Sequence, residues 1–425
     1  MRYRTYFIIL LCASSYASSR SIKLRPGRVA SRMGDMSSAS FTEVPLAVTQ
    51  SQDWFTLADS CLSPNAYSDL ANSQSTTSTQ DPSVAVAKTL ENISVPFSKA
   101  DSTYLHVKGT LLVFSIRHSF PYNWNNIKHV GESAFPTWEL LEEGVDSVLL
   151  WQIDEKPYDW IKGVGKMLGK NYDQTTLFFK KDLSNGICAD KVIAPRKWPA
   201  VPYDSLFTST GTQAQYRAKV VPNLGLSETL LTQQPACTAL VLFRALPQGW
   251  KNAPQIQSKL QNFMKHRNWK LKIWAPGCKY PLTNQFYSLD ATSSISVGTS
   301  FSMSFRDQVE LFADVSLSIM PTSAENANLP FQPPKSAIIS VNKCGENSFL
   351  KNEAARYGFD SYDSYPADCS IPFSSATWNW DINEHGDYTM DFEHDLVPVL
   401  EKAMTSLERR GVCRPDMRLS DRPIV

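Results

Sequence analysis

The sequence lacks an excess of charge of either sign, because 42 Lys and Arg residues stand against 41 Asp and Glu residues in 425. A nearly neutral chain has no overall field that would draw it to phosphate backbones or to anionic membranes. We therefore expect no nucleic-acid partner. Long apolar runs are also missing: the N-terminal run, residues 6–13, is less than half of the roughly 20 residues that a membrane span requires.

The N-terminus nevertheless has the composition of a secretory signal. Arg2 and Arg4 precede the short apolar run, and small and polar residues follow it at positions 14–18. This order is typical of a cleaved signal peptide. We expect residues 1–19 to be removed, which places the chain in the lumen of the endoplasmic reticulum or Golgi, or outside the cell, with no membrane span left. A retained anchor is the alternative. The segment Asn92-Ile93-Ser94 matches a glycosylation acceptor motif, which fits the secretory pathway.

Metal-binding cysteine patterns are absent as well. The chain has no Cys-x-x-Cys and only six His residues, so the sequence does not favour a zinc site. In an oxidising compartment we expect a few disulfides instead. Seven cysteines remain after signal cleavage, so at least one stays unpaired or pairs with another molecule: Cys61, Cys188, Cys237, Cys278, Cys344, Cys369 and Cys413.

The rest of the chain divides into a low-complexity segment and a long alternating segment. Residues 20–99 show no sustained apolar period, which predicts a flexible stem. Beyond it the apolar patterns predict strands at 104–116, 147–153, 175–180, 237–243, 269–274, 315–320, 337–341 and near 359, and helices at 130–141, 160–168, 254–267, 305–312, 349–357 and 392–410. This alternation indicates an α/β fold with two Rossmann-like, doubly wound domains facing a cleft, at residues 100–225 and 226–425, joined near the Pro-rich stretch 194–222.

One segment carries a recognisable motif. It begins Phe305-Arg306-Asp307-Gln308-Val309, continues into Pro321-Thr322-Ser323-Ala324, and ends Pro333-Pro334-Lys335-Ser336. The stretch resembles, without gaps, the most characteristic block of glycosyltransferase family 61, which includes plant xylosyl- and arabinosyltransferases and an animal transferase that places N-acetylglucosamine on extracellular proteins. The resemblance implies a GT-B type fold, in which the N-terminal domain binds the acceptor and the C-terminal domain binds the nucleotide-sugar donor.

The resemblance also implies a set of donor-binding residues. They lie in the turn after the strand at 315–320, in the helix that follows, and beyond the strand at 237–243: Thr322, Ser323, Ala324, Asn328, Arg244 and Asn252. Small residues at such a turn let backbone N–H groups approach a diphosphate, with the helix dipole adding attraction, and Arg244 is suited to hold a phosphate bidentately. The alternative is an ordinary strand-turn-helix unit without a ligand, with Arg244 as a surface cation.

Two further residues match the family's N-terminal segment, in which an Asn, a His and an acidic residue open a helix. His129 and Glu132 lie three positions apart, so a helix would present them on neighbouring faces. An inverting sugar transfer needs a base for the acceptor hydroxyl, and either group is suited to that role. Alternatively, His129 is a partly buried core residue and Glu132 favours the N-terminus of the helix.

Three positions depart from the family pattern. Thr322 and Ser323 stand where the family usually has His and Gly, and Ser340 stands where it has a Glu that would accept hydrogen bonds from ribose; Glu346 is a candidate replacement. The chain also has no Asp-x-Asp, the pair through which many other glycosyltransferases hold a metal. We therefore expect a metal-independent reaction with no cofactor, in which Arg244, the backbone amides of residues 323–326 and the helix dipole neutralise the leaving group.

The sequence thus favours a secretory-pathway glycosyltransferase that inverts configuration and moves xylose, arabinose or N-acetylglucosamine from a nucleotide sugar, such as a UDP-sugar, to a hydroxyl of a glycan or glycoprotein. The alternative is an inactive relative that binds glycans or a partner enzyme. A hydrolase has little support, because Gly298-Thr299-Ser300-Phe301-Ser302 lacks the closing Gly of a nucleophile elbow. Neither a phosphate-loop lysine motif nor a dinucleotide glycine pattern occurs.

Overall fold

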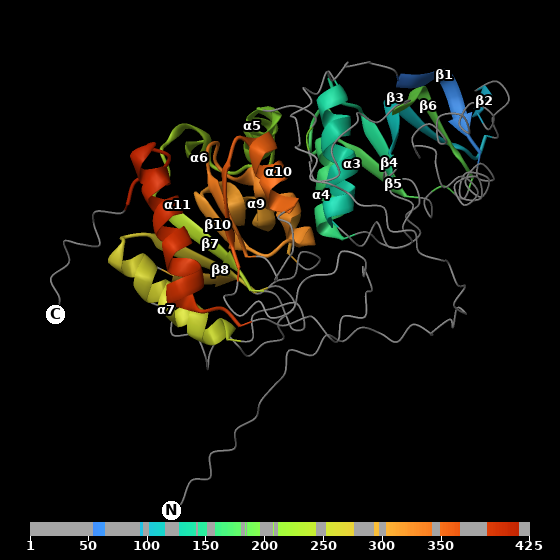
Figure 1. Cartoon of the computed structure of the whole chain (residues 1–425). Coiled ribbons are helices and arrows are strands. Elements are labelled where there is room, and N and C mark those ends of the chain that lie inside the picture. Colours follow the sequence, from blue (N-terminus) through green and yellow to red (C-terminus); the bar gives the residue numbers. More distant parts are fainter. Residues whose placement is uncertain are drawn as a thin grey trace, which may run out of the picture.

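The computed structural model describes residues 54–63, 94–96, 102–114, 127–141, 143–150, 158–179, 183, 185–195, 207, 211–243, 252–275, 293–296, 303–341, 349–365 and 389–415. These residues form two six-stranded sheets with helices packed between and around them (Figure 1). No helix among them is long and apolar enough to cross a bilayer.

The first sheet has a parallel centre and an antiparallel edge. Its strands are β1 (Trp54–Leu62), β2 (Ser94–Pro96), β3 (Leu105–Phe114), β4 (Ser147–Leu150), β5 (Thr176–Phe179) and β6 (Ile187–Pro195), in the order β2-β1-β6-β3-β4-β5. Strands β6, β3, β4 and β5 pair with one another in parallel, whereas β1 is antiparallel to β6 and β2 is antiparallel to β1. Helices α3 (Ile127–Leu140) and α4 (Asp159–Met167) follow β3 and β4, as parallel pairing requires.

Strand β1 lies inside the segment that the sequence assigns to a flexible stem. It pairs with β6 from Trp54↔Pro195 to Leu62↔Ile187, and the Cys61–Cys188 disulfide joins the two strands. The stem prediction is therefore wrong for residues 54–62. The physical reason is that an edge strand is fixed by its partner, and nothing in its own composition shows a partner about 130 residues away in sequence.

At a bulge in β3, side-chain carboxylates accept the backbone hydrogen bonds that the neighbouring strands do not. The register shifts between Val107 and Thr110, and Gly109 takes a positive φ of 82°. The Gly109 N–H donates to Asp190 Oδ2 (2.7 Å), and the Thr110 N–H donates to Asp146 Oδ2 (2.7 Å). Any side chain at position 109 would overlap the Asp146 carboxyl group, so glycine is required there.

The second sheet is parallel throughout. Its strands are β7 (Thr238–Leu242), β8 (Lys270–Trp274), β9 (Ser293–Ser296), β10 (Leu317–Met320), β11 (Ala337–Val341) and β12 (Asp360–Ser364), in the order β12-β11-β10-β7-β8-β9. This is the strand order of a doubly wound Rossmann sheet, in which the winding reverses between the first and fourth strands, here β7 and β10. The predicted α/β fold with two Rossmann-like, parallel-rich sheets is confirmed.

Helices cover both faces of this sheet. One face is covered by α7 (Ala253–His266), α11 (Val397–Arg409) and the π-helical turn η5 (Phe392–Leu396). The other face is covered by α9 (Phe305–Ala313), the 3-10 helix η4 (Ala324–Phe331) and α10 (Phe349–Tyr357). Ser304 caps α9, because its hydroxyl accepts from the Asp307 N–H at 3.0 Å. The sequence missed α5 (Thr212–Asn223), which lies in the stretch interpreted as a hinge, and the short α6 (Thr229–Thr232) after it.

The space between the two sheets is filled by a common core. Helices α3 and α4 pack against η4 and α9, and the rings that meet there are Phe135, Trp160, Phe207, Tyr216, Phe305 and Phe331. The ring centroids of Phe135 and Phe207 are 5.2 Å apart, and those of Trp160 and Phe305 are 6.0 Å apart. The two domains therefore share one hydrophobic cluster along this boundary.

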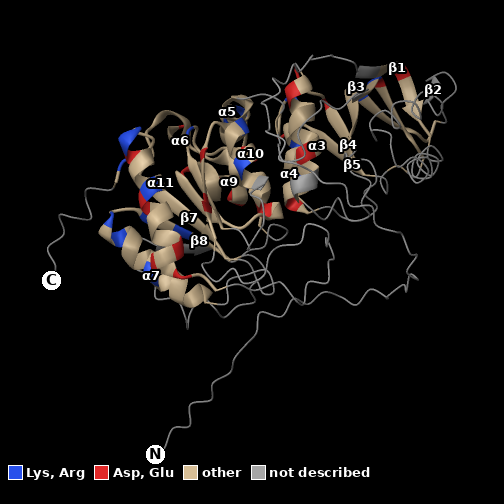
Figure 2. Cartoon of the chain, in the orientation of Figure 1, with Lys and Arg blue, Asp and Glu red and all other residues tan. Residues whose placement is uncertain are grey.

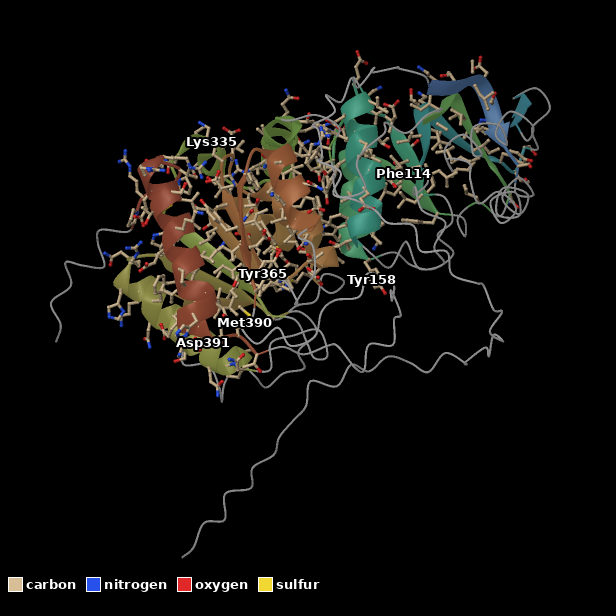
Figure 3. The ribbon with its side chains drawn as sticks, viewed as in Figure 1. Phe114, Tyr158, Lys335, Tyr365, Met390 and Asp391 are labelled. Carbon is tan, nitrogen blue, oxygen red and sulfur yellow. A yellow bond between two sulfur atoms is a disulfide. The ribbon has the colours of Figure 1, made fainter. Side chains whose placement is uncertain are left out.

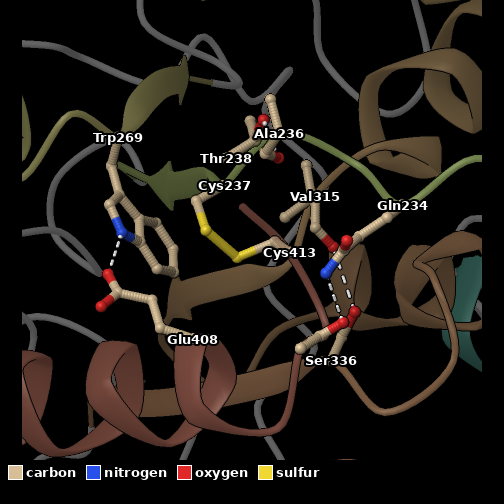
Figure 4. Close-up of a disulfide and its surroundings, with 10 residues drawn as sticks. Gln234, Ala236, Cys237, Thr238, Trp269, Val315, Ser336, Glu408 and Cys413 are labelled. Carbon is tan, nitrogen blue, oxygen red and sulfur yellow. Dashed lines mark hydrogen bonds between the residues drawn. A yellow bond between two sulfur atoms is a disulfide. The ribbon is translucent and has the colours of Figure 1, made fainter. Parts of the chain in front are cut away.

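A second disulfide closes the C-terminal part of the fold. Cys237, just before β7, is bonded to Cys413, just after α11 (Figure 4). Beside it, Trp269 Nε1 donates to Glu408 Oε1 at 2.7 Å. The expectation of disulfides is confirmed for the four described cysteines, whereas Cys278, Cys344 and Cys369 lie outside the described residues.

Candidate functional site

The strand order of the second sheet points to one place for a ligand. In doubly wound sheets ligands bind beyond the carboxyl ends of the strands, where the winding reverses. Here that place lies between the end of β7 at Leu242 and the end of β10 at Met320. The segments that follow β7, β8, β9, β11 and β12 fall largely outside the described residues, whereas the turn after β10 is described throughout. The described geometry of the candidate site therefore comes from residues 321–328.

Some buried polar atoms in this turn have no hydrogen-bond partner among the described residues, and two of them could face a ligand. They are Thr322 Oγ1 and Asn326 Nδ2, and Asn326 is fully buried. The other side-chain atom of Asn326, Oδ1, accepts from Ser323 Oγ at 3.3 Å. Buried polar groups are normally satisfied, and an unpaired one costs about 1–3 kcal/mol. A polar ligand at this edge would remove that cost.

The charge at the start of η4 differs from that of a simple phosphate loop. Glu325, in the first turn of η4, is 6% exposed. A carboxylate there suits the positive end of the helix, but it opposes a diphosphate approaching the same amides. Small size is retained, since Ser323 and Ala324 flank the turn. The turn therefore has the small residues on which the prediction depends, with an acidic side chain beside them.

Asn328, which the resemblance assigns to the donor, has a different role. Its Oδ1 accepts from Trp160 Nε1 at 2.7 Å, and its Nδ2 donates to Gln308 Oε1 at 3.0 Å and to the Glu325 carbonyl at 3.3 Å. The side chain is fully buried. The donor-binding prediction for Asn328 is therefore corrected: its hydrogen-bonding atoms join η4 to α4 and α9.

Asn252 is also occupied within the protein. Its Nδ2 donates to the Met390 carbonyl at 2.7 Å, and its Oδ1 accepts from the Met390 N–H at 3.2 Å. The side chain holds the segment before η5 to the start of α7 (Met390 is labelled in Figure 3). We therefore assign Asn252 a structural role in place of the predicted donor contact.

Of the two predicted catalytic residues, the structure describes the side chain of Glu132 alone. Glu132 is 4% exposed on α3 and faces α10. Burial first, and then the nearby charges of Glu353 and Glu132, raise the pKa of Tyr357 well above its usual value. Glu132 thus lies in the packed boundary between the domains. The side chains of His129 and Arg244, and Glu346, lie outside the described residues, so their roles stay predictions.

Glu353, a fully buried acid on α10, was not among the predicted site residues. A signal was available: Leu350, Glu353, Ala354 and Tyr357 have the i, i+3, i+4, i+7 spacing of one helix face, so the pattern puts a carboxyl group at a core position. Among the described residues no group of three or more His, Cys, Asp and Glu side chains is placed to hold a metal ion.

Helix α5 supplies two anchors for η4 that the sequence also missed. Gln213 Nε2 donates to the Pro330 and Gln332 carbonyls at 2.6 and 2.9 Å. Arg217 Nε donates to the Phe331 carbonyl at 2.9 Å, and its Nη2 donates to the carbonyls of Leu230 (2.6 Å) and Ala313 (2.8 Å). Burial lowers the pKa of Arg217 to about 10, which leaves it charged at neutral pH.

No family model matches the chain, and no curated protein matches it. Among solved structures it is similar to the bacterial iron-containing dodecameric glycosyltransferase TibC from enterotoxigenic E. coli H10407, at 12% identity over 75% of this chain and 82% of that chain, with a TM-score of 0.33.

It is also similar to the E. coli heptosyltransferase WaaC, with ADP-2-deoxy-2-fluoro heptose (TM-score 0.25) and with ADP (TM-score 0.26), each at 10% identity over 61% of this chain and 93% of that chain. All are glycosyltransferases by name. Membership of family 61 stays a prediction.

Proposed function

We propose that the chain is a secretory-pathway glycosyltransferase that binds a nucleotide sugar, such as a UDP-sugar, at the carboxyl edge between β7 and β10. The observation that carries this proposal is the pair of buried, unpartnered atoms Thr322 Oγ1 and Asn326 Nδ2 at the point where the winding of the sheet reverses. A hydroxyl and an amide N–H are suited to the oxygens of a phosphate or a sugar. Ser323 and Ala324 leave room for that ligand.

The proposed reaction is an inverting transfer of xylose, arabinose or N-acetylglucosamine. An acceptor hydroxyl of a protein or polysaccharide attacks the anomeric carbon from the face opposite the leaving nucleoside diphosphate. A base removes the hydroxyl proton. Because Glu132 is buried at the domain boundary, we favour His129 as that base. The diphosphate departs with the bonding electrons, and Arg244 and the amides of residues 323–326 neutralise its charge without a metal or other cofactor.

The proposed compartment is supported by the two disulfides. Cys61–Cys188 and Cys237–Cys413 join residues 127 and 176 positions apart. Such bonds form and persist in the secretory pathway or outside the cell and are rare in a reducing cytosol. They accord with the signal peptide expected at residues 1–19.

The direct test measures UDP and UDP-sugar binding by calorimetry. Thr322→Val removes only the hydroxyl, and we expect it to weaken binding by about tenfold, or about 1.4 kcal/mol. Ser316→Ala is the matched control, because Ser316 Oγ is likewise buried and unpartnered but lies at the opposite end of β10. Equal affinity of Thr322→Val and wild type would sink the proposed site.

Activity is tested on a panel of UDP-sugars by measuring sugar release. We expect release by the wild type with one donor of the panel and its loss in Arg244→Ala, since the leaving diphosphate would lose its counter-charge. Release that is unchanged in Arg244→Ala would remove the role proposed for that side chain.

A second candidate is an inactive glycosyltransferase-like protein that binds glycans or a partner enzyme. Glu325 favours it, because this acid is buried where a diphosphate would meet the turn. Calorimetry separates the two candidates. Wild type that binds a glycan but not UDP supports the inactive protein. Wild type that binds UDP, with binding retained in Glu325→Gln, supports the transferase.

A further inference from the structure

Seven basic side chains gather at the amino edge of the second sheet, opposite the candidate site. We call them the amino-edge cluster: Lys265, Arg267, Lys270, Lys335, Arg409, Arg410 and Arg414. Lys265 and Arg267 lie at the end of α7, Arg409 and Arg410 at the end of α11, and the others in strand ends and turns. Figure 2 shows Lys and Arg at these ends of α7 and α11, and Figure 3 labels Lys335 near the end of α11.

A backbone hydrogen bond and a disulfide bring the strand-end members together. The Lys270 N–H donates to the Cys237 carbonyl at 2.9 Å, and the Cys237–Cys413 disulfide places Arg414 next to the same strand. Parallel strands lie about 4.8 Å apart, so the three strand steps from β8 to β11 span roughly 15 Å. Lys270 and Lys335 therefore stand near the two ends of a short basic row.

Contacts of the helix ends close the cluster. Arg410 Nη2 donates to the Lys335 carbonyl at 3.2 Å, and Arg267 Nη2 donates to Thr405 Oγ1 at 3.4 Å, which joins the end of α7 to α11. Carboxyl groups also lie at this edge: Asp360 pairs with Arg410 at 2.8 Å, Glu408 accepts from Trp269, and Asp314 pairs with Lys272 of β8. The seven cations outnumber these three acids, so this edge is basic, although the whole chain carries a net charge of +1.

Helix-end electrostatics explains part of this arrangement. Cations in the last turn of a helix interact favourably with its dipole, and Lys265 and Arg409 occupy such positions. Lys270, Lys335 and Arg414 lie outside any helix, and all three are exposed. Lys335 also holds a positive φ of 64°, a conformation that offers a lysine no intrinsic advantage. The cluster therefore exceeds what the helices require.

A shallow hollow adjoins one end of the cluster. It measures about 480 Å³ between α11 and β12, and Arg409, Lys402 and Glu401 are among its lining residues, with Lys402 Nζ 5.7 Å from the centroid of the Tyr362 ring. Arg409 and Lys402 extend the basic surface to this hollow, and Glu401 is the carboxyl group in its lining.

We propose that the amino-edge cluster binds a sulfated polysaccharide. Arginine forks hold sulfate oxygens in pairs, as they hold phosphate, and a row of roughly 15 Å matches several charged groups of a linear chain. An anionic membrane fits less well, because the exposed large apolar side chains among the described residues, Leu105, Tyr158 and Tyr365, lie outside the cluster. Duplex DNA offers phosphates of similar charge, and its affinity relative to that of heparin decides between the two ligands.

The amino-edge cluster lies at the edge of the sheet opposite the nucleotide-sugar site. Polysaccharide binding and nucleotide-sugar binding can therefore be tested independently. A bound polysaccharide leaves the carboxyl edge open. The expected consequence is that charge reversal in the cluster changes polysaccharide binding and leaves the affinity for UDP unchanged.

The experiment compares two charge-matched triple variants of the full chain on heparin. The cluster variant carries Lys270→Glu, Arg409→Glu and Arg414→Glu; the control carries Lys108→Glu, Lys191→Glu and Lys351→Glu, all at exposed positions elsewhere. We expect the cluster variant to lose about tenfold or more in heparin affinity, because fewer counterions are released, and the control to change little. Equal losses in both variants would show an effect of net charge alone and overturn the proposal.

Two further measurements guard against misfolding and a wrong ligand. Heparin should protect Lys270 and Lys335 of the wild type from acetylation while leaving Lys108 and Lys351 reactive, which needs no variant. Binding by the wild type to phosphatidylserine-containing vesicles or to duplex DNA as tightly as to heparin, through the same lysines, would overturn the choice of polysaccharide. Absence of heparin binding by the wild type at physiological salt would overturn the whole proposal.

Discussion

At the scale of single residues, the position of η4 depends on a few buried polar side chains. Arg217 alone donates to three carbonyls, which belong to η4, α6 and the end of α9. We expect Arg217→Met to lower the free energy of unfolding by about 3–5 kcal/mol, because three carbonyls lose a charged donor. Urea unfolding measures this. The exposed neighbour Gln215→Met is the control, and a similar loss there would contradict the assignment.

Asp146 is the residue whose titration should register in stability. Burial raises its pKa, but the Thr110 N–H and the Lys170 ammonium, 3.1 Å away, outweigh that effect and hold the pKa below its usual value. A carboxyl group with a depressed folded pKa stabilises the protein above its unfolded pKa and loses that contribution as pH falls through the folded value. Asp146→Asn should therefore be less stable than wild type at neutral pH, with the difference shrinking below about pH 4. A difference that stays constant from pH 7 to pH 3 in urea titrations would refute this account.

At the scale of elements, glycine positions in α4 set its distance from α9. A Cβ at Gly163 would overlap the Phe305 ring, whereas a Cβ at Gly165 would lie 3.2 Å from the flexible end of Leu177. We expect Gly163→Ala to cost about 1–3 kcal/mol through overpacking. Gly165→Ala gains up to about 1 kcal/mol of helix propensity, which offsets its mild crowding. Thermal unfolding of the pair tests the contact, and equal melting temperatures would argue against close α4–α9 packing.

At the scale of the whole molecule, the shared core should make the two sheets unfold together. Leu112 of the first sheet and Leu240 of the second belong to one buried cluster, so unfolding either half exposes apolar surface of the other. We expect one calorimetric transition. Leu149→Ala and Leu400→Ala, in the separate outer cores of the two sheets, should each cost about 2–5 kcal/mol and lower that same transition. Two transitions that move independently would contradict a shared core.

The same scale explains why a neutral composition concealed a basic surface. Lys270, Lys335 and Arg414 are far apart in the sequence and meet because parallel strands align their amino ends. The net charge of +1 correctly describes the whole chain and says nothing of one edge. The fold therefore decides which charged partners the protein can bind. Heparin binding measures the effect of the local charge at this edge as distinct from the net charge of the chain.

The sequence by itself determined the elements whose signal is local. Strands β7 and β11 are apolar at four of their five positions and buried at every position, and α7 carries its apolar residues at helical spacing, so both patterns could be read directly. Only the tertiary structure decided which atoms remained available for a ligand. Asn328 matched a family position, yet a tryptophan 168 residues earlier in the chain occupies its oxygen, while Thr322 and Asn326 keep unpartnered atoms. Hydrogen-bond partners distant in sequence leave no local trace, which is why the elements were predictable and the role of each polar side chain was not.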